Sequence, residues 1–192
     1  TSAASQIDGL AAFVGARPIC EHRPMAERVK TAGGTPVGGW VLRGDRSTFD
    51  VGPMIERYGQ VYRYPVEPGD RADLMAPGQP CFLYLTDTSR VVGLWGIGEV
   101  VAPVLLVPDD PASIEGPATL MTEVEILPLA KPIAESRLRA EKVLAGSEMF
   151  TAADLSNPLV LEPRAVRAIE SFEFELVSPT EEQADRLDAL LA

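Results

Sequence analysis

The sequence predicts a mixed α/β fold, in which short strands form a small β-barrel with short peripheral helices and an N-terminal helical extension. Two observations lead to this expectation. From Gly38 onward short strand-like segments follow one another, and the longest, residues 91–101, contains glycines that permit the bends a closed barrel requires. The last third of the chain is helical, so the order of elements is not that of a βαβ array.

The first 38 residues differ in pattern from the rest. Residues 6–15 have a helical pattern, and residues 25–30 predict another short helical turn before the breaker Gly33-Gly34-Thr35-Pro36. We therefore expect a helical appendage and linker over residues 1–38 and one domain over residues 39–192.

Strands are expected at five places in the central part of the domain. Residues 80–85 are almost wholly apolar, which is typical of a strand buried on both faces. Pro65 places its strand at a sheet edge, since proline cannot donate to a ladder. Besides residues 91–101, the expected strands are 39–43, 60–66, 80–85 and 119–126, and a short helix is expected over residues 47–58 with Asp50 as its cap.

Short helices dominate the C-terminal part. They are expected over residues 137–145, 151–155 and 163–171, the last beginning with Pro163. A final strand is expected over residues 172–177. The run Ser178-Pro179-Thr180-Glu181 has the composition of a capping box that opens a last helix.

The composition of the chain limits the cellular compartment and the binding partners that we expect for it. The longest apolar run, residues 100–107, is far short of the roughly 20 residues that cross a bilayer, and residues 1–20 lack a secretion signal. We expect a cytoplasmic protein with no membrane partner, in which Cys20 and Cys81 stay as thiols. The net charge of −11 disfavours bulk binding to phosphate backbones.

Catalytic and metal-binding patterns are missing from the sequence. The single histidine, His22, lies between Pro18 and Pro24 and has no nucleophile at a telling position. With Cys20 and Cys81 it falls short of the four ligands of a structural zinc site. We therefore expect no enzyme activity, no metal and no cofactor.

Six aromatic side chains fall on predicted strands. Core packing is the ordinary interpretation of any one of them, and the alternative is that two or three line a barrel mouth and sandwich a planar ring. Stacking a base on an aromatic ring contributes roughly 1–3 kcal/mol without bulk positive charge. The six residues are Trp40, Tyr62, Tyr64, Phe82, Tyr84 and Trp95.

Four segments in order resemble the EVE domain family. They are residues 39–45 (GWVLRGD), 61–64 (VYRY), 71–84 (RADLMAPGQPCFLY) and 92–100 (VGLWGIGEV). Residues 124–126 and the later Leu129, Pro132 and Ile133 match the usual continuation, so the resemblance covers about residues 38–174. Gln79 stands where the family has an acid, which we interpret as a turn preference.

The resemblance implies a PUA-like barrel that reads a modified base, notably modified cytosine in DNA, or an RNA base. It nominates Arg43, Gly44 and Asp45 for polar contacts to the base edge. Tyr62 would be a stacking wall opposite Trp95 or Tyr64, with Trp40 leading the first strand of the same site. Arg63 and Arg71 would contact phosphate.

Three functional hypotheses follow. A reader of a modified base is favoured, and it predicts a basic rim formed by Arg43, Arg46, Arg57, Arg63 and Arg71. The alternative is a protein-interaction module that uses the acidic surface and residues 1–38. An enzyme using Asp45 or Glu99 with an arginine is the least favoured, because no paired carboxylate or base supports it.

Overall fold

A six-stranded mixed sheet forms the centre of the molecule in the computed structural model, which describes residues 29–44, 49–87, 90–108, 118–152 and 157–191. The strand order is β2-β5-β4-β3-β1-β6. The β1 and β3 strands are parallel, and the other neighbours are antiparallel. The strands are β1 (Gly39–Gly44), β2 (Val61–Pro65), β3 (Pro80–Leu85), β4 (Gly93–Pro108), β5 (Ala118–Ala134) and β6 (Leu159–Leu161).

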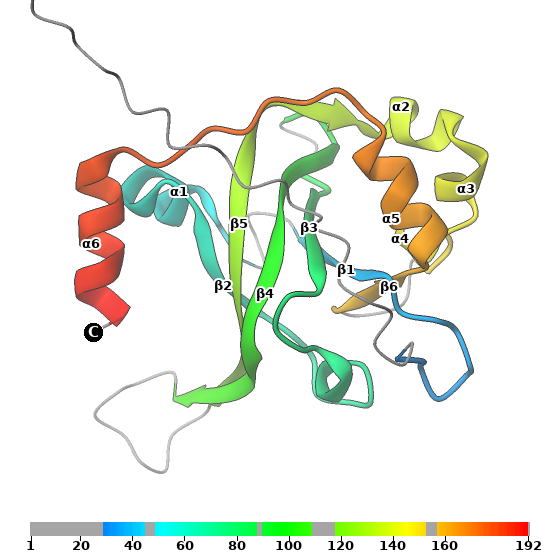
Figure 1. Cartoon of the computed structure of the whole chain (residues 1–192), viewed down its shortest axis with the longest axis horizontal. Coiled ribbons are helices and arrows are strands. Elements are labelled where there is room, and N and C mark those ends of the chain that lie inside the picture. The colour runs from blue at the N-terminus through cyan, green and yellow to red at the C-terminus, as the bar shows by residue number, and fades with distance from the viewer. Residues whose placement is uncertain (1–28, 45–48, 88–89, 109–117, 153–156, 192) are drawn as a thin grey trace, which may run out of the picture.

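Short helices surround the sheet. Figure 1 shows α1 and α6 on one side of the strands and α2 to α5 on the other. The helices are α1 (Gly52–Tyr58), the 3-10 turn η1 (Ala72–Leu74), α2 (Glu135–Ala140), α3 (Lys142–Ala145), α4 (Glu148–Thr151), α5 (Pro163–Glu170) and α6 (Glu181–Leu191). No helix in the described part of the chain is long and apolar enough to cross a membrane.

The long β4–β5 hairpin has several shifts in register, and glycines on β4 let its two strands approach closely. A Cβ added at Gly96 would lie 2.6 Å from Cγ2 of Ile126, and one at Gly98 would lie 1.7 Å from the carbonyl oxygen of Glu125. The two strands therefore approach more closely than side chains allow. These contacts explain why glycine stands at both positions.

The core has one part on each face of the sheet. On one face Trp40, Leu42 and Tyr64 pack under α1 and η1, and on the other Val41 and Phe82 pack under α2 to α5. Every residue of β3 after Pro80 is buried, so the prediction of a strand buried on both faces is confirmed.

The ladder of the described strands does not close into a barrel. Its edges are β2 and β6, and the edge position predicted from Pro65 is confirmed. Just beyond these strands the two edges meet at one backbone hydrogen bond, in which the N–H of Glu67 donates to the carbonyl of Asn157 over 2.9 Å. We call this contact the seam.

Several expected elements differ in extent. The strand expected over residues 172–177 is wrong, since only an isolated bridge joins Leu176 to Leu129, and β6 was not expected at all. The helix expected over residues 137–145 is interrupted at Glu141, whose backbone is extended. The capping box of α6 is Thr180 with Gln183, each side chain accepting from the other's backbone N–H. The helices expected within residues 1–28 lie outside the described residues.

Replacing Gly98 by alanine tests the close approach of β4 and β5. The added methyl group would overlap the Glu125 carbonyl, so we expect the free energy of unfolding to fall by about 3 kcal/mol or more. Urea denaturation measures the loss. Gly146→Ala is the matched control, because its nearest neighbour, the Lys142 oxygen, would be 3.8 Å away; an equal loss in both variants would contradict the assignment.

Candidate functional site

A pocket of about 460 Å³ opens where β1 and β2 end and β5 begins. It contains two residues that the sequence nominated for base binding, Arg43 and Tyr64. Gly44 follows Arg43 at the end of β1, and Asp45 lies outside the described residues. The lining consists of Arg43, Phe49, Tyr64, Pro65, Val66, Glu67, Pro68, Ala118, Thr119, Leu120 and Asn157.

Two aromatic rings meet in this pocket. Phe49 packs edge-to-face on Tyr64, with ring centroids 5.1 Å apart and an interplanar angle of 71°. Tyr64 is 1% exposed and belongs to the core, whereas Phe49 is only partly buried. Phe49 is therefore the ring on which a ligand can stack. Sequence reasoning missed it, because it precedes α1 outside the strand pattern that selected the other aromatics.

Asn157 fixes the wall of the pocket at the seam. Its side-chain oxygen accepts from the N–H of Arg43 over 2.7 Å, and its amide donates to the carbonyl of Arg43 over 2.6 Å. The side chain thus continues the β1–β6 pairing where the backbone ladder has stopped. The Arg43 guanidinium donates to the carbonyl of Ala152, just beyond α4, over 3.1 Å.

Trp40 is fully buried and lies in the core, not at a ligand surface. Its indole N–H donates to Oε1 of Gln79 over 2.6 Å, and the same oxygen accepts from the N–H of Ala76. The Gln79 amide also donates to the carbonyl of Leu74. Gln79 thus satisfies a buried indole in addition to shaping the turn, a role that the sequence interpretation omitted.

Tyr62 and Trp95 lie away from the pocket. Tyr62 packs edge-to-face on Tyr58 beneath α6, and Arg63 lies over its ring. Trp95 donates its indole N–H to the carbonyl of Val91, and Arg90 lies over its ring. The structure therefore does not bring these two aromatics together with Arg43.

Arg71 is held by an acid. Its guanidinium forms a two-pronged ion pair with Glu148, at 2.7 and 3.0 Å, and Glu148 also accepts from the N–H of Val160. This arrangement ties the 3-10 turn to α4 and β6. Arg71 therefore has a structural partner in Glu148.

Burial and hydrogen bonding shift the pKa values of three ionisable groups. Burial raises the pKa of the Cys81 thiol to about 12, so this thiol stays protonated. Burial, followed by its hydrogen bond to Glu135, raises the pKa of Tyr84. In that same bond the Tyr84 hydroxyl donates to the Glu135 carboxylate over 2.7 Å. This bond, followed by the hydrogen bond from the Arg139 guanidinium, lowers the pKa of Glu135.

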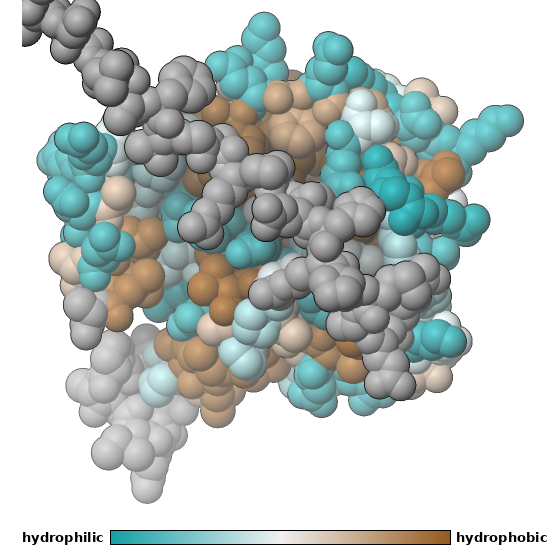
Figure 2. All heavy atoms as spheres, in the orientation of Figure 1, coloured by the Kyte–Doolittle hydropathy of each residue, from teal (hydrophilic) through white to brown (hydrophobic). Residues whose placement is uncertain are grey.

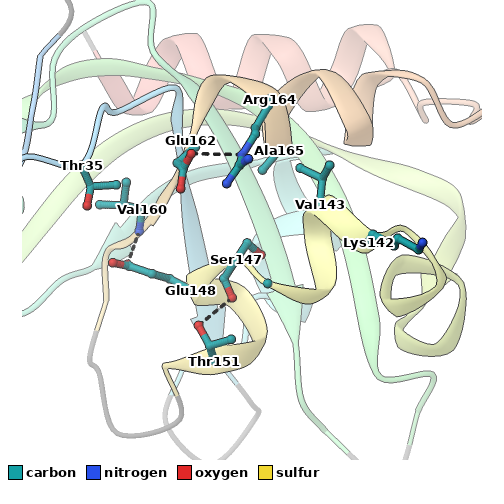
Figure 3. Close-up of a pocket in the computed structure, with 11 residues that line it drawn as sticks. Thr35, Lys142, Val143, Ser147, Glu148, Thr151, Val160, Glu162, Arg164 and Ala165 are labelled. Carbon is teal, nitrogen blue, oxygen red and sulfur yellow. Dashed lines mark hydrogen bonds and ion pairs between the residues drawn. The ribbon is translucent and has the colours of Figure 1, made fainter.

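A second pocket of about 390 Å³ lies between α3, α4, β6 and the start of α5, as Figure 3 shows. Three of its polar side chains have partners within the pocket. Glu162 pairs with Arg164, Glu148 accepts from Val160, and Thr151 donates to the carbonyl of Ser147. In the chain segments that the structure describes, no three His, Cys, Asp or Glu side chains are grouped to hold a metal.

Removing the Gln79 side chain tests its role at Trp40. In Gln79→Ala the buried indole N–H loses its acceptor, so we expect a loss of about 1–3 kcal/mol in unfolding free energy, measured by urea denaturation. Gln79→Glu keeps the acceptor for the indole but cannot donate to the carbonyl of Leu74, so it should lose part of this free energy and less than Gln79→Ala. Equal stability of Gln79→Ala and the wild type would contradict this role.

The Tyr84–Glu135 bond predicts a pH dependence. The folded pKa of Glu135 is depressed, so its stabilisation is full above its ordinary value of 4.5 and is lost as the pH falls through the folded value. Tyr84→Phe should therefore be less stable than wild type at pH 7, with the difference shrinking below pH 4.5. Urea titrations across pH 3–7 measure it, and a difference independent of pH would contradict the linkage.

Comparison with known proteins identifies similar folds. No model of a known protein family matches the sequence, and no curated protein matches it. The structure of a hypothetical protein from Leishmania major is similar at a TM-score of 0.52 and 17% identity, covering 70% of this chain and 92% of that chain. An X-ray structure of a protein from Pseudomonas putida is similar at a TM-score of 0.51 and 15% identity, covering 69% of this chain and 97% of that chain. At such identities the likeness establishes a shared fold alone.

Proposed function

We propose that the chain is a non-catalytic reader of the EVE type, which takes one modified base from a DNA or RNA strand into the pocket at the ends of β1 and β2. The observation that carries this proposal is the pocket itself. It joins an accessible aromatic ring, Phe49, to the nominated residues Arg43 and Tyr64.

The size and lining of the pocket suit a single planar ring. A volume of about 460 Å³ lies within the roughly 300–1,000 Å³ of small-ligand sites. Phe49 offers a stacking face, and the Arg43 guanidinium and Glu67 carboxylate supply a donor and an acceptor for a base edge. A base inside a duplex cannot reach such a pocket, so it would enter from a single strand or after being flipped out.

Of the five arginines expected around the pocket, one lines it, three lie elsewhere and Arg46 lies outside the described residues. Among the described lining residues Arg43 is the one cation. Arg57 and Arg63 lie over the rings of Tyr58 and Tyr62, and Arg71 is paired with Glu148. The affinity of the proposed reader therefore comes from the pocket more than from phosphate contacts, which is compatible with the net charge of −11.

Phe49→Leu tests the stacking role, because leucine keeps an apolar side chain but removes the ring. We expect fluorescence anisotropy with labelled oligonucleotides carrying modified cytosine or methylated adenine to show binding that prefers one modification. Phe49→Leu should weaken it by about tenfold, as the loss of one stacked base implies.

Tyr62→Ala and Trp95→Ala are the matched controls, since both aromatics lie outside the pocket. We expect them to bind like the wild type. Loss of binding in either control with full binding in Phe49→Leu would refute this site, and no saturable binding to any of the oligonucleotides would refute the reader.

The salt dependence of that binding distinguishes pocket from backbone recognition. Each phosphate contact adds about 0.7–0.9 to the slope of log Kd against log salt concentration. With one cation in the described lining we expect a slope of about one or less. A slope of about four, as five phosphate contacts would give, would contradict the pocket as the source of affinity.

A further inference from the structure

We infer that the groove between α6 and the outer side of β2, β5 and β4 is a docking surface for a basic, amphipathic segment of another protein. The groove has a volume of about 400 Å³ and lies apart from the proposed base pocket. It is lined by Tyr58, Gln60, Tyr62, Val101, Glu123, Val124, Glu125, Leu127, Pro179, Ala184, Leu187, Asp188 and Leu191.

The groove exists because α6 is attached at one end. Gln183, in the first turn of α6, donates its amide to the carbonyl of Glu56 at the end of α1 over 2.9 Å. Pro179 packs so closely on Gly59 that a Cβ there would lie 2.7 Å from it. Leu187 is buried, while Leu190 and Leu191, in the last turn of α6, are 48% and 62% exposed.

The floor of the groove is apolar. Val101 is 48% exposed on β4, and Leu127 on β5 is partly buried. The ring of Tyr62 stands edge-to-face on that of Tyr58. Figure 2 shows hydrophobic side chains reaching the surface on the side where Figure 1 places α6. Apolar surface rimmed by polar groups is typical of a protein-binding site.

The charged residues that line the groove are acidic. Glu123, Glu125 and Asp188 line it, and no lysine or arginine does among the described lining residues. Glu99 lies directly opposite Glu125 in the β4–β5 ladder, and like charges in that position destabilise a sheet. Two arginines border the groove, since Arg57 and Arg63 lie over the rings of Tyr58 and Tyr62, which line it. Arg63 also stands opposite Glu123 in the β2–β5 ladder, so the acidic side of the rim is that of Glu99, Glu125 and Asp188.

An apolar floor with carboxylates on its rim is complementary to one class of partner. A segment with apolar residues on one face and lysine or arginine on the other would bury the first in the groove and pair the second with the rim. The same rim repels nucleic acid phosphates and acidic peptides. The occupant is therefore a basic amphipathic peptide segment.

A designed peptide tests this inference on the full chain. The probe is a labelled helical peptide of leucine and lysine, with leucines at positions i, i+3, i+4 and i+7, and its control has the same composition with the leucines scattered. We expect the probe to bind more tightly than its control by anisotropy. Amide signals of the ¹⁵N-labelled protein should shift around residues 58–62, 123–127 and 184–191.

Charge reversal separates the groove from the general acidity of the chain. Glu123→Lys with Glu125→Lys should weaken binding by about tenfold, and Val101→Ser by about three- to tenfold. Glu173→Lys with Glu175→Lys is the matched control, since both acids are exposed, have the same spacing and do not line the groove. That control, and Phe49→Leu in the base pocket, should bind the peptide as the wild type does.

Two results would overturn the inference. Equal weakening by both charge-reversed pairs would show attraction to the overall charge of the chain. Signal shifts confined to residues outside the groove would place the peptide elsewhere. In either case the proposed function of the base pocket would still stand, because its test uses different residues and a different ligand.

Discussion

The close approach of β4 and β5 at Gly96 and Gly98 is the constraint on which the rest of the structure depends. The two strands lie together with no side chain between them at these positions, and β2, which pairs with β5, ends close enough to the β6 edge for Glu67 to donate to Asn157. Tyr64 can then join Trp40 and Leu42 in one core. The same arrangement brings the ends of β1 and β2 to one pocket, so a packing requirement on one hairpin creates a site made by two other strands.

Much of the fold could be predicted because the relevant signals are local. Alternation, continuous apolar runs and Pro65 are visible in a few adjacent residues, and they identified five of the six strands. The strand β6 has three residues, Leu159–Leu161, too few for a periodic pattern. The isolated bridge at Leu176 shows that an alternating sequence also needs a partner strand with free hydrogen-bonding groups.

The site was harder to predict because it depends on which way each side chain faces. The β2–β5 register shifts between Val61 and Arg63, and such a shift changes the face to which Tyr62 points. Tyr62 consequently lies under α6 while Tyr64, two residues later, lies in the core beside the pocket. Phe49 has no strand pattern to identify it, and Gln79 meets Trp40 only through contacts 39 residues apart in the chain. The resemblance to the EVE family remains a prediction about function.

At the seam one peptide hydrogen bond stands where a closed barrel would have a full ladder. A ladder of hydrogen bonds fixes two strands in a single register, whereas the seam fixes the two sheet edges at one point only. The segments on either side of it can therefore change in length or course during evolution while the sheet and its core stay the same. Because the seam forms a wall of the candidate pocket, changes in these segments would alter the shape of the pocket more than the core of the sheet.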